Sequence, residues 1–414
     1  MKKSMLKFVI LFSLIILFIS CSKKTQNGEK SDKKKITITF WAYEPTEING
    51  RELYKKILDM FYKKYPEIRV KIVYITKDGS KEKLRSAIVT NSLPDCSYLD
   101  YASLPSYAKG NTIYNLEELF PRLKEKPILD DFYKGVETLC KYKNKFYALP
   151  LSQQCVALFY NKDLIKKPPK TWDEMIKIAK KIYKPGKIAA FDVPQPNGWG
   201  AWFFPAFLYS AGGKLIDESG KKVLFNSEAG VKALNLWKEL LKYSPKDIIY
   251  SAYAFESGKI GMELSGRWEI MKIEANFPNL NYGITLVPKD KKYATNMGAD
   301  LLVVYKSSKH PIAALKFIYF LTTPEVQRIV QDIVGGLPIR KGLEKYWKDD
   351  EKMQIFLKQA EYAVPPPSVP GWAKINDVVI ADAIREVLDG KLSAQEALNK
   401  AAERANKILQ EEAE

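Results

Sequence analysis

Three tryptophans lie beside glycines in stretches without helical or strand periodicity. Trp199 stands between two glycines, and Trp268 and Trp372 each follow a glycine within two residues. A lone tryptophan belongs to a core more often than to a binding surface. An indole in a glycine-rich loop, however, has no helix face to bury, so we interpret these three as binding positions. Trp172 and Trp237 lie on apolar helix faces and are expected in the core.

The sequence argues against several kinds of catalysis. Its single histidine, His310, precedes a proline in a polar turn, which disfavours a Ser-His-Asp triad or a histidine zinc site. Cys96, Cys140 and Cys155 have no metal-ligand spacing and sit among apolar residues. We expect buried free thiols, with one disulfide as the alternative in an exported protein. We therefore predict no catalytic residue, metal or cofactor.

The N-terminus has the pattern of an export signal. Three lysines precede an apolar run at residues 8–19, which is too short to span a bilayer but fits a signal-peptide core. The run ends at Ser20-Cys21, which resembles a lipobox and predicts lipidation of Cys21. Phe18 departs from the usual leucine, so a plain secretory signal is the alternative. Residues 1–20 are thus a predicted signal peptide, and 21–35 a lipidated cysteine and disordered tether.

Length and charge suit a globular protein outside the N-terminal segment. The 414 residues allow two or three domains, and the formal net charge is +18. The lysines are spread along the chain, a pattern that favours solubility and attraction to an anionic envelope over nucleic-acid binding.

The first hundred residues alternate strand and helix patterns. Apolar residues alternate at 36–40 and 68–74, helical spacing follows each, and a short strand runs through Leu99. This order predicts a parallel sheet, in which ligands lie beyond the carboxyl ends of the strands. The residues at those ends are 41–44, 78–79 and 100–101.

Residues 147–174 have the pattern of a linker that crosses from one domain to another. Ser152, Gln153 and Gln154 separate two apolar runs, the second of which, 156–160, predicts a buried strand. Thr171 and Glu174 have capping-box spacing, so a helix should begin at Trp172. Polar side chains in the middle of a buried linker favour a cleft beside the crossing.

These pieces together resemble the extracellular solute-binding proteins of bacterial sugar ABC transporters, the family that includes maltose-binding protein. The resemblance covers nearly everything after residue 35. Its strongest part is 147–174, and one departure is 298–299, where many members have two glycines. The other matching stretches are 38–41 (ITFW), 93–95 (LPD), 107–110 (YAKG), 266–268 (GRW), 308–314 (SKHPIAA), 338–340 (PIR) and 390–398 (GKLSAQEAL).

The resemblance implies an α/β fold of the two-lobed periplasmic-binding-protein type (type II), with discontinuous lobes joined by a hinge and a ligand cleft between them. The first lobe would hold 36–150 and 300–350, and the second 151–299 and 351–414. The implied function is the substrate-binding component of an ABC importer, which is a membrane-tethered monomer at the outer face of the membrane or in the periplasm. Its partners would be a sugar or oligosaccharide and the permease, not nucleic acid.

The resemblance also implies a set of ligand contacts. Sugar sites combine aromatic platforms with planar hydrogen-bonding groups. One of Gln153 and Gln154 takes the position of an acidic contact in maltose-binding protein. The expected contacts are Tyr43, Glu44, Asp100, Gln153, Gln154, Trp199, Trp202, Trp268, Asp300, Arg340 and Trp372.

Two other functions fit the same residues. A receptor of this fold for an anionic ligand, such as a sugar acid or glycerol phosphate, would use Arg267 or Arg340. An anchored glycoside hydrolase would need two converging carboxylates, for which Glu44 and Asp100 are the candidates.

Overall fold

A computed structural model describes residues 35–45 and 50–414 of the chain. The predicted signal peptide, Cys21 and the tether up to residue 34 lie outside these residues. Lys35–Glu414 forms one compact unit. None of the helices in the described ranges combines the length and apolarity needed to cross a membrane.

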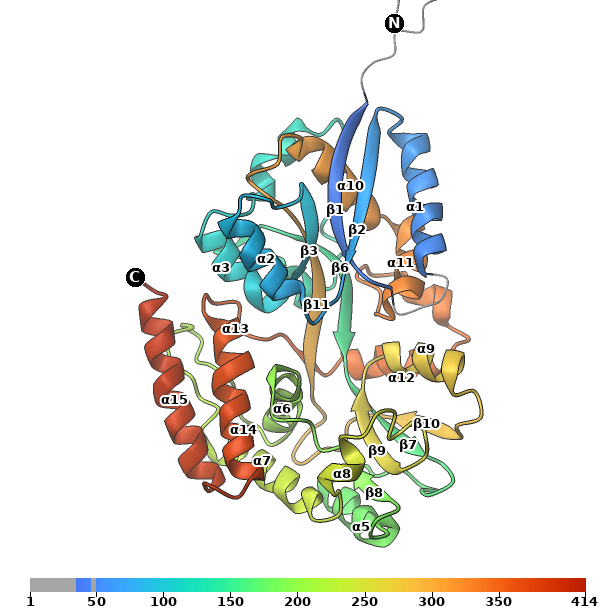
Figure 1. Cartoon of the computed structure of the whole chain (residues 1–414), viewed down its shortest axis with the longest axis vertical. Helices are drawn as coiled ribbons and strands as arrows, with labels where there is room; N and C mark the ends of the chain where they lie inside the picture. Colours follow the sequence, from blue (N-terminus) through green and yellow to red (C-terminus); the bar gives the residue numbers. More distant parts are fainter. Residues whose placement is uncertain (1–34, 46–49) are drawn as a thin grey trace, which may run out of the picture. The chain divides into compact units, whose positions relative to one another are not determined.

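Two sheets organise the described residues (Figure 1). The larger contains β1 (Ile36–Tyr43), β2 (Ile68–Ile75), β3 (Cys96–Asp100), β6 (Leu149–Cys155), β11 (Thr295–Val304) and β12 (Ala363–Val364). The smaller has the order β10 (Tyr282–Thr285), β7 (Ala157–Asn161), β9 (Ile260–Ser265) and β8 (Ala189–Phe191). A separate ribbon pairs β4 (Lys141–Tyr142) with β5 (Lys145–Phe146).

Helices surround both sheets. Those between the first strands and the crossing are α1 (Gly50–Lys64), α2 (Ser80–Val89), α3 (Leu104–Lys109) and α4 (Lys134–Leu139). The middle of the chain forms α5 (Trp172–Ile182), α6 (Gly198–Ser210), α7 (Glu228–Leu241), α8 (Lys246–Ile249) and α9 (Trp268–Asn276). The last part forms α10 (Pro311–Leu321), α11 (Pro324–Val334), α12 (Glu351–Ala360), α13 (Trp372–Lys374), α14 (Ala381–Leu388) and α15 (Ala394–Glu411).

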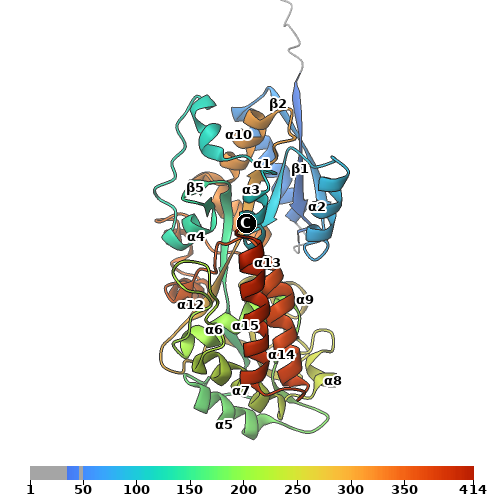
Figure 2. The same cartoon turned by 90° about the vertical axis from the view of Figure 1, so that its left-hand side faces the viewer.

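The apolar side chains form two separate cores. The first core surrounds β1, β2 and β3 and includes Phe40 and Phe317. The second surrounds β7, β8 and β9 and includes Phe159 and Trp237. Strand β6 passes from one core to the other, because Leu149 packs in the first and Cys155 in the second. Figure 2 shows α14 and α15 alongside the part of the molecule that holds α5 and α7.

Several predictions are confirmed. Strand β1 pairs in parallel with both β2 and β3. Thr171 accepts from the Glu174 amide at the start of α5. The three cysteines of the described part are free and buried. Trp172 and Trp237 are buried core residues.

The expectation of a glycine-rich loop around Trp199 is wrong. Gly198–Ser210 forms helix α6, and the Asn197 side chain caps it by accepting from the Gly200 amide at 3.0 Å. Nearly every face of this helix is buried, so the sequence carries no amphipathic period that would reveal a helix. A Cβ at Gly200 would lie 1.8 Å from the Gln195 carbonyl oxygen. This glycine therefore permits a close backbone approach.

Trp268 and Trp372 were also expected in loops, and each is instead the first residue of a helix, α9 or α13. Gly371, with φ of +80°, turns the chain into α13. A π-helical segment, Ile375–Ile380, then continues α13 into α14. The glycines beside these tryptophans thus mark helix starts.

Candidate functional site

A polar cluster lies where β6 and β11 cross between the cores. Their antiparallel register sets Ser152 opposite Asp300 and Gln154 opposite Gly298. The Asp300 Oδ2 atom accepts from the Gln154 amide at 2.9 Å and from the Ser152 hydroxyl at 3.2 Å. Its Oδ1 atom accepts from Lys77 at 3.2 Å. The buried carboxylate thus has a hydrogen bond on both oxygens, one of them from a cation.

A second group of charges lies beside this cluster. Asp100, at the end of β3, is paired in register with Asp300 and caps a short 3₁₀ turn through the Ala102 amide. The Lys81 amino group lies 3.9 Å from an Asp100 oxygen and 2.5 Å from an oxygen of Asp377. Burial raises the pKa of Asp100, and the charge of Lys81 opposes that rise. Because Lys81 belongs to α2 and Asp377 to the π-helical segment, the pair joins elements of different cores.

Tyr43 lies at the end of β1, near the same carboxylates. Its ring meets Tyr98 edge to face at 4.9 Å, and the Lys77 amino group lies 5.5 Å from its centroid. Burial raises the pKa of the Tyr43 hydroxyl well above its usual value, and Asp300 and Asp100 raise it further. The hydroxyl therefore stays protonated and able to donate a hydrogen bond.

Trp199, Trp202 and Trp268 form an aromatic wall. Trp199 stacks on Trp202 with centroids 5.1 Å apart and 22° between planes. Trp268 lies 5.9 Å from Trp199 and 6.1 Å from Trp202. Gly298 makes room for the wall, because a Cβ there would lie 3.0 Å from the Trp202 ring. Trp199 is 51% exposed, so part of the wall faces solvent.

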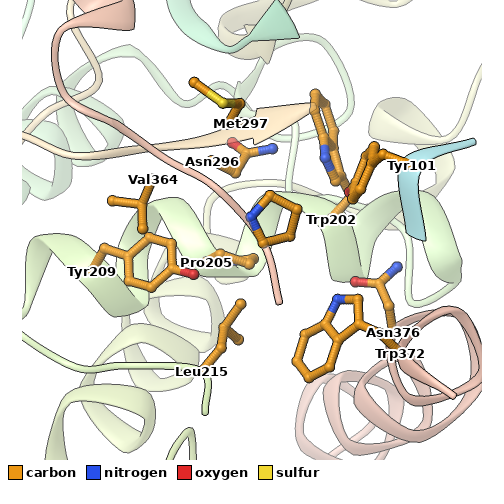
Figure 3. Close-up of a pocket in the computed structure, with 11 residues that line it drawn as sticks. Tyr101, Trp202, Pro205, Tyr209, Leu215, Asn296, Met297, Val364, Trp372 and Asn376 are labelled. Carbon is orange, nitrogen blue, oxygen red and sulfur yellow. The ribbon is translucent and has the colours of Figure 1, made fainter. Parts of the chain in front are cut away.

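A small pocket, called here the hinge pocket, lies next to Trp202 of the aromatic wall (Figure 3). Its walls come from α6, β11, the segment around β12 and the start of α13. The free space takes about one water molecule, so the side chains nearly fill it. The lining residues are Tyr101, Trp202, Pro205, Tyr209, Leu215, Asn296, Met297, Val364, Pro366, Trp372 and Asn376.

Three of the expected contact residues lie apart from these groups. Glu44 is exposed and paired with Arg51 at 2.7 Å. The Gln153 amide donates to the Pro338 carbonyl at 2.7 Å. Buried Arg340 donates to the Thr322 carbonyl at 2.6 Å and pairs with Asp131. The structure brings together the other eight expected residues, either in the polar and charged groups, in the aromatic wall or in the hinge pocket. Trp372, however, is 2% exposed and packs in the second core, contrary to the expectation of an open binding position.

Sequence reasoning missed several residues of these groups. Lys77 directly precedes residues 78–79 and Lys81 follows them by two positions, so the sequence predicted this loop at a strand end but not its cations. Asn296, Tyr209 and Asp377 belong to buried or helical stretches in which the sequence pattern does not indicate a function. Their positions depend on how distant segments pack.

The fold and the site define a class of two-lobed binding proteins, and the comparisons identify it. The family model described as bacterial extracellular solute-binding protein matches residues 56–355. The chain belongs to this family. The members are transport binding proteins that act outside the cytoplasm.

Relatives share most of the length of the chain. A maltooligosaccharide ABC transporter solute-binding lipoprotein of Streptococcus pneumoniae is 23% identical, and the match covers 92% of each chain. A solute-binding protein of Thermotoga lettingae, solved with α-D-tagatose, is 29% identical with a TM-score of 0.80, covering 91% of this chain and 100% of that one. The GacH receptor of Streptomyces glaucescens, solved with acarbose, is 25% identical with a TM-score of 0.80, covering 91% and 99%.

Proposed function

We propose that this protein binds a sugar or oligosaccharide in the cleft between its lobes and delivers it to the permease of an ABC importer. The observation that carries the proposal is an aromatic wall beside a group of hydrogen-bonding carboxylates and amides. Indoles cover the apolar CH faces of a sugar, and carboxylates and amides bind its hydroxyls. The ligands named for the Streptococcus, Thermotoga and Streptomyces proteins are all of this kind.

The ligand contacts in this proposal are Tyr43, Asp100, Gln154 and Asp300 on the polar side and Trp199, Trp202, Trp268 and Trp372 on the aromatic side. The lobes would comprise 36–150 with 300–350 and 151–299 with 351–414, joined near β6, β11 and the stretch before α12. Leu343 and Trp347 of that last stretch pack into the second core.

We further propose that the protein has no enzymatic activity. Glycoside hydrolysis needs two carboxyl groups that flank the sugar, one of them a general acid. Of the two candidates, Asp100 lies beside Lys81, whereas Glu44 is exposed and pairs with Arg51. Prolonged incubation of a bound saccharide should therefore leave it unchanged by chromatography.

We also propose that Cys21 carries a lipid that holds the protein at the outer face of the membrane, as a monomer. Cys21→Ala should release the protein from membranes or leave it as the precursor. Retention equal to that of the wild type would contradict the anchor.

A thermal-shift screen of the soluble body, residues 35–414, tests the main proposal. The panel should include glucose, maltose, maltotriose, maltotetraose, tagatose, glucuronate and glucose 6-phosphate. A ligand present at about one hundred times its dissociation constant adds about 2.7 kcal/mol of apparent stability. A response to anionic compounds alone would favour the sugar-acid reading, and no response to any saccharide would overturn the proposal.

A further inference from the structure

Helices α9 and α11 belong to different cores and touch at their ends. Helix α11 packs in the first core through Val330, whereas Trp268, the first residue of α9, packs against the second. Gly335, with φ of +58°, follows the last turn of α11. A Cβ atom at Gly335 would lie 2.7 Å from the Trp268 Cα atom and 2.9 Å from the Met271 sulfur. The two helices thus meet without room for a side chain between them.

Arg267 holds the same two helices together. It directly precedes α9, and its Nη1 atom donates to the Gln331 carbonyl at 3.0 Å and to the Gly336 carbonyl at 3.4 Å. Gln331 belongs to the last turn of α11, where the carbonyl groups carry partial negative charge and favour a cation. Burial raises the pKa of Asp332 in the same turn, and the charges of Arg267 and Arg328 oppose that rise. Arg267, a candidate for binding an anionic ligand, therefore already has partners at the end of α11.

Trp268 lies between glycines of the two cores. Its ring covers Gly266, where an added Cβ atom would be 2.0 Å from a ring carbon, and its own Cβ atom would be 3.0 Å from one added at Gly335. The ring in turn contacts Trp199 and Trp202 in the aromatic wall. The distance of this wall from the polar side therefore depends on how closely α9 approaches α11.

The contact has a counterpart across the crossing strands. Figure 1 shows α9 and α11 on one side of β6 and β11, and α2 and α13 on the other. There the Lys81 amino group of α2 lies 2.5 Å from an oxygen of Asp377, in the segment that follows α13. Both contacts join elements of different cores, so both form only when the two lobes are close together.

From these contacts we infer that the carboxyl end of α11 is the seat on which α9 docks when the lobes close, and that Gly335 and Arg267 are positioning residues for Trp268. Gly335 permits the close approach because it has no side chain, and Arg267 orients the start of α9 by binding two carbonyl groups. The inference rests on the proposed sugar-binding function, in which Trp268 is a ligand contact. It assigns Arg267 to lobe closure and not to the ligand.

The test compares Gly335→Ala with Gly342→Ala by calorimetric titration. The probe is maltotriose, or the neutral saccharide with the largest shift in the screen above. Both glycines have positive φ, so alanine strains the backbone at each, but a Cβ atom at Gly342 would meet nothing within 4 Å. Gly335→Ala should lower affinity about tenfold or more, because the added methyl group disfavours the closed state that holds ligand. Gly342→Ala should bind as wild type does. Small-angle scattering at saturating ligand should give a larger radius of gyration for Gly335→Ala than for wild type.

Arg267 provides a second test of the same contact. Arg267→Gln should weaken binding about three- to tenfold through faster dissociation, measured by stopped-flow tryptophan fluorescence. Arg267→Lys should recover part of this loss, because an ammonium group can still donate to one carbonyl but not to two in a fixed geometry. Arg328→Gln is the matched control, since Arg328 is an exposed cation on α11.

Melting curves without ligand identify the folded variants. If Gly335→Ala binds as Gly342→Ala does, the inference is overturned while sugar binding stays intact. If Gly335→Ala does not fold, the arginine variants decide, and equal dissociation rates for Arg267→Gln and Arg328→Gln would overturn the inference. If wild type binds no neutral saccharide, the proposed function and the inference both fail.

Discussion

The polar and the aromatic sides of the candidate site differ in whether a ligand must replace contacts that the protein already makes. On the side of the first core, Lys77 and Lys81 already pair with Asp300, Asp100 and Asp377, so a hydroxyl gains only by replacing bonds that exist. On the side of the second core, the exposed ring of Trp199 and the half-buried ring of Trp268 offer apolar area that a sugar covers without displacing a partner. This difference predicts that affinity comes mainly from the aromatic side and orientation mainly from the polar side.

The largest expected effect separates an aromatic platform from a core residue. Trp237 of α7 is fully buried against α6, where it meets Phe204 and Phe207 edge to face. Trp237→Ala should lower the free energy of unfolding by some 3 to 5 kcal/mol, because it opens a cavity. Denaturant unfolding measures this loss, and a ligand that still binds the folded fraction normally would show that Trp237 has no binding role.

Trp268→Ala, in contrast, is expected to weaken binding more than stability. This ring is half-buried at the edge of the second core, so its removal should cost less stability. Binding should weaken by about ten- to a hundredfold, or roughly 1 to 3 kcal/mol, because the ligand loses a large apolar contact. If the variant melts early but binds at wild-type strength, Trp268 is a core residue and the aromatic side is misplaced.

Four acidic side chains cluster around α9, the helix that begins at Trp268. Glu269 of α9 and Glu256 both pair with Lys272, and Glu263 of β9 and Asp192 lie close to them. Burial raises the pKa of Asp192 to about 7, with Glu256 and Glu269 adding to the rise. Burial likewise raises the pKa of Glu263 and Glu269. These four carboxyl groups thus share one lysine. At the cleft, by contrast, Asp100, Asp300 and Asp377 share Lys77 and Lys81.

This group should make stability fall as pH rises. The folded state holds protons that the unfolded state releases above about pH 4, so stability is lost as pH passes from there through about 7. Asp192→Asn should be more stable than wild type at pH 8 by on the order of 1 to 3 kcal/mol, with the gap closing toward pH 4. Melting curves across this range check it. An offset that is constant with pH would show that Asp192 does not titrate in the folded state.

A smaller effect should come from the ion pair between the two sides. Lys81 and Asp377 join different cores, so their attraction favours the closed arrangement that holds ligand. Asp377→Asn should weaken binding by about three- to tenfold in low salt and less at high salt, because salt screens partly exposed pairs. Salt dependence of affinity therefore does not by itself indicate an anionic ligand.

The control for this prediction is Asp389→Asn. Asp389 pairs with Lys246 at 2.8 Å, and both belong to segments of the second core. Its loss should leave binding unchanged at any salt concentration. An equal effect of both substitutions would attribute the change to net charge and remove the role of Lys81 in closure.

The sequence predicted the tryptophans of the aromatic side and the ends of the first strands. It did not predict how distant segments pack together around them. Alternating apolar residues gave β1 and β2, and glycines drew attention to Trp199, Trp268 and Trp372. Helix α6 was missed because burial on nearly all sides removes its periodic pattern. Arg340 was expected at the ligand and instead holds the Thr322 carbonyl, since a motif fixes residue type but not the direction of a side chain. Asn296 could be found only once distant segments had packed around the hinge pocket that it lines.

The smallest expected effect tests the boundary of the polar side. Glu44 follows β1 directly after Tyr43, yet it pairs with Arg51, and the two side chains are 42% and 64% exposed. Such a pair contributes little, about 0 to 1 kcal/mol, and a carboxylate directed at Arg51 is not available to a sugar hydroxyl. Glu44→Gln should therefore change both affinity and melting temperature within about twofold and a degree or two. Asp100→Asn, one strand away beside Lys81, should weaken binding clearly more in the same titration. A loss of fivefold or more in Glu44→Gln would mean that this side chain leaves Arg51 when ligand binds, and that the polar side extends one residue beyond Tyr43.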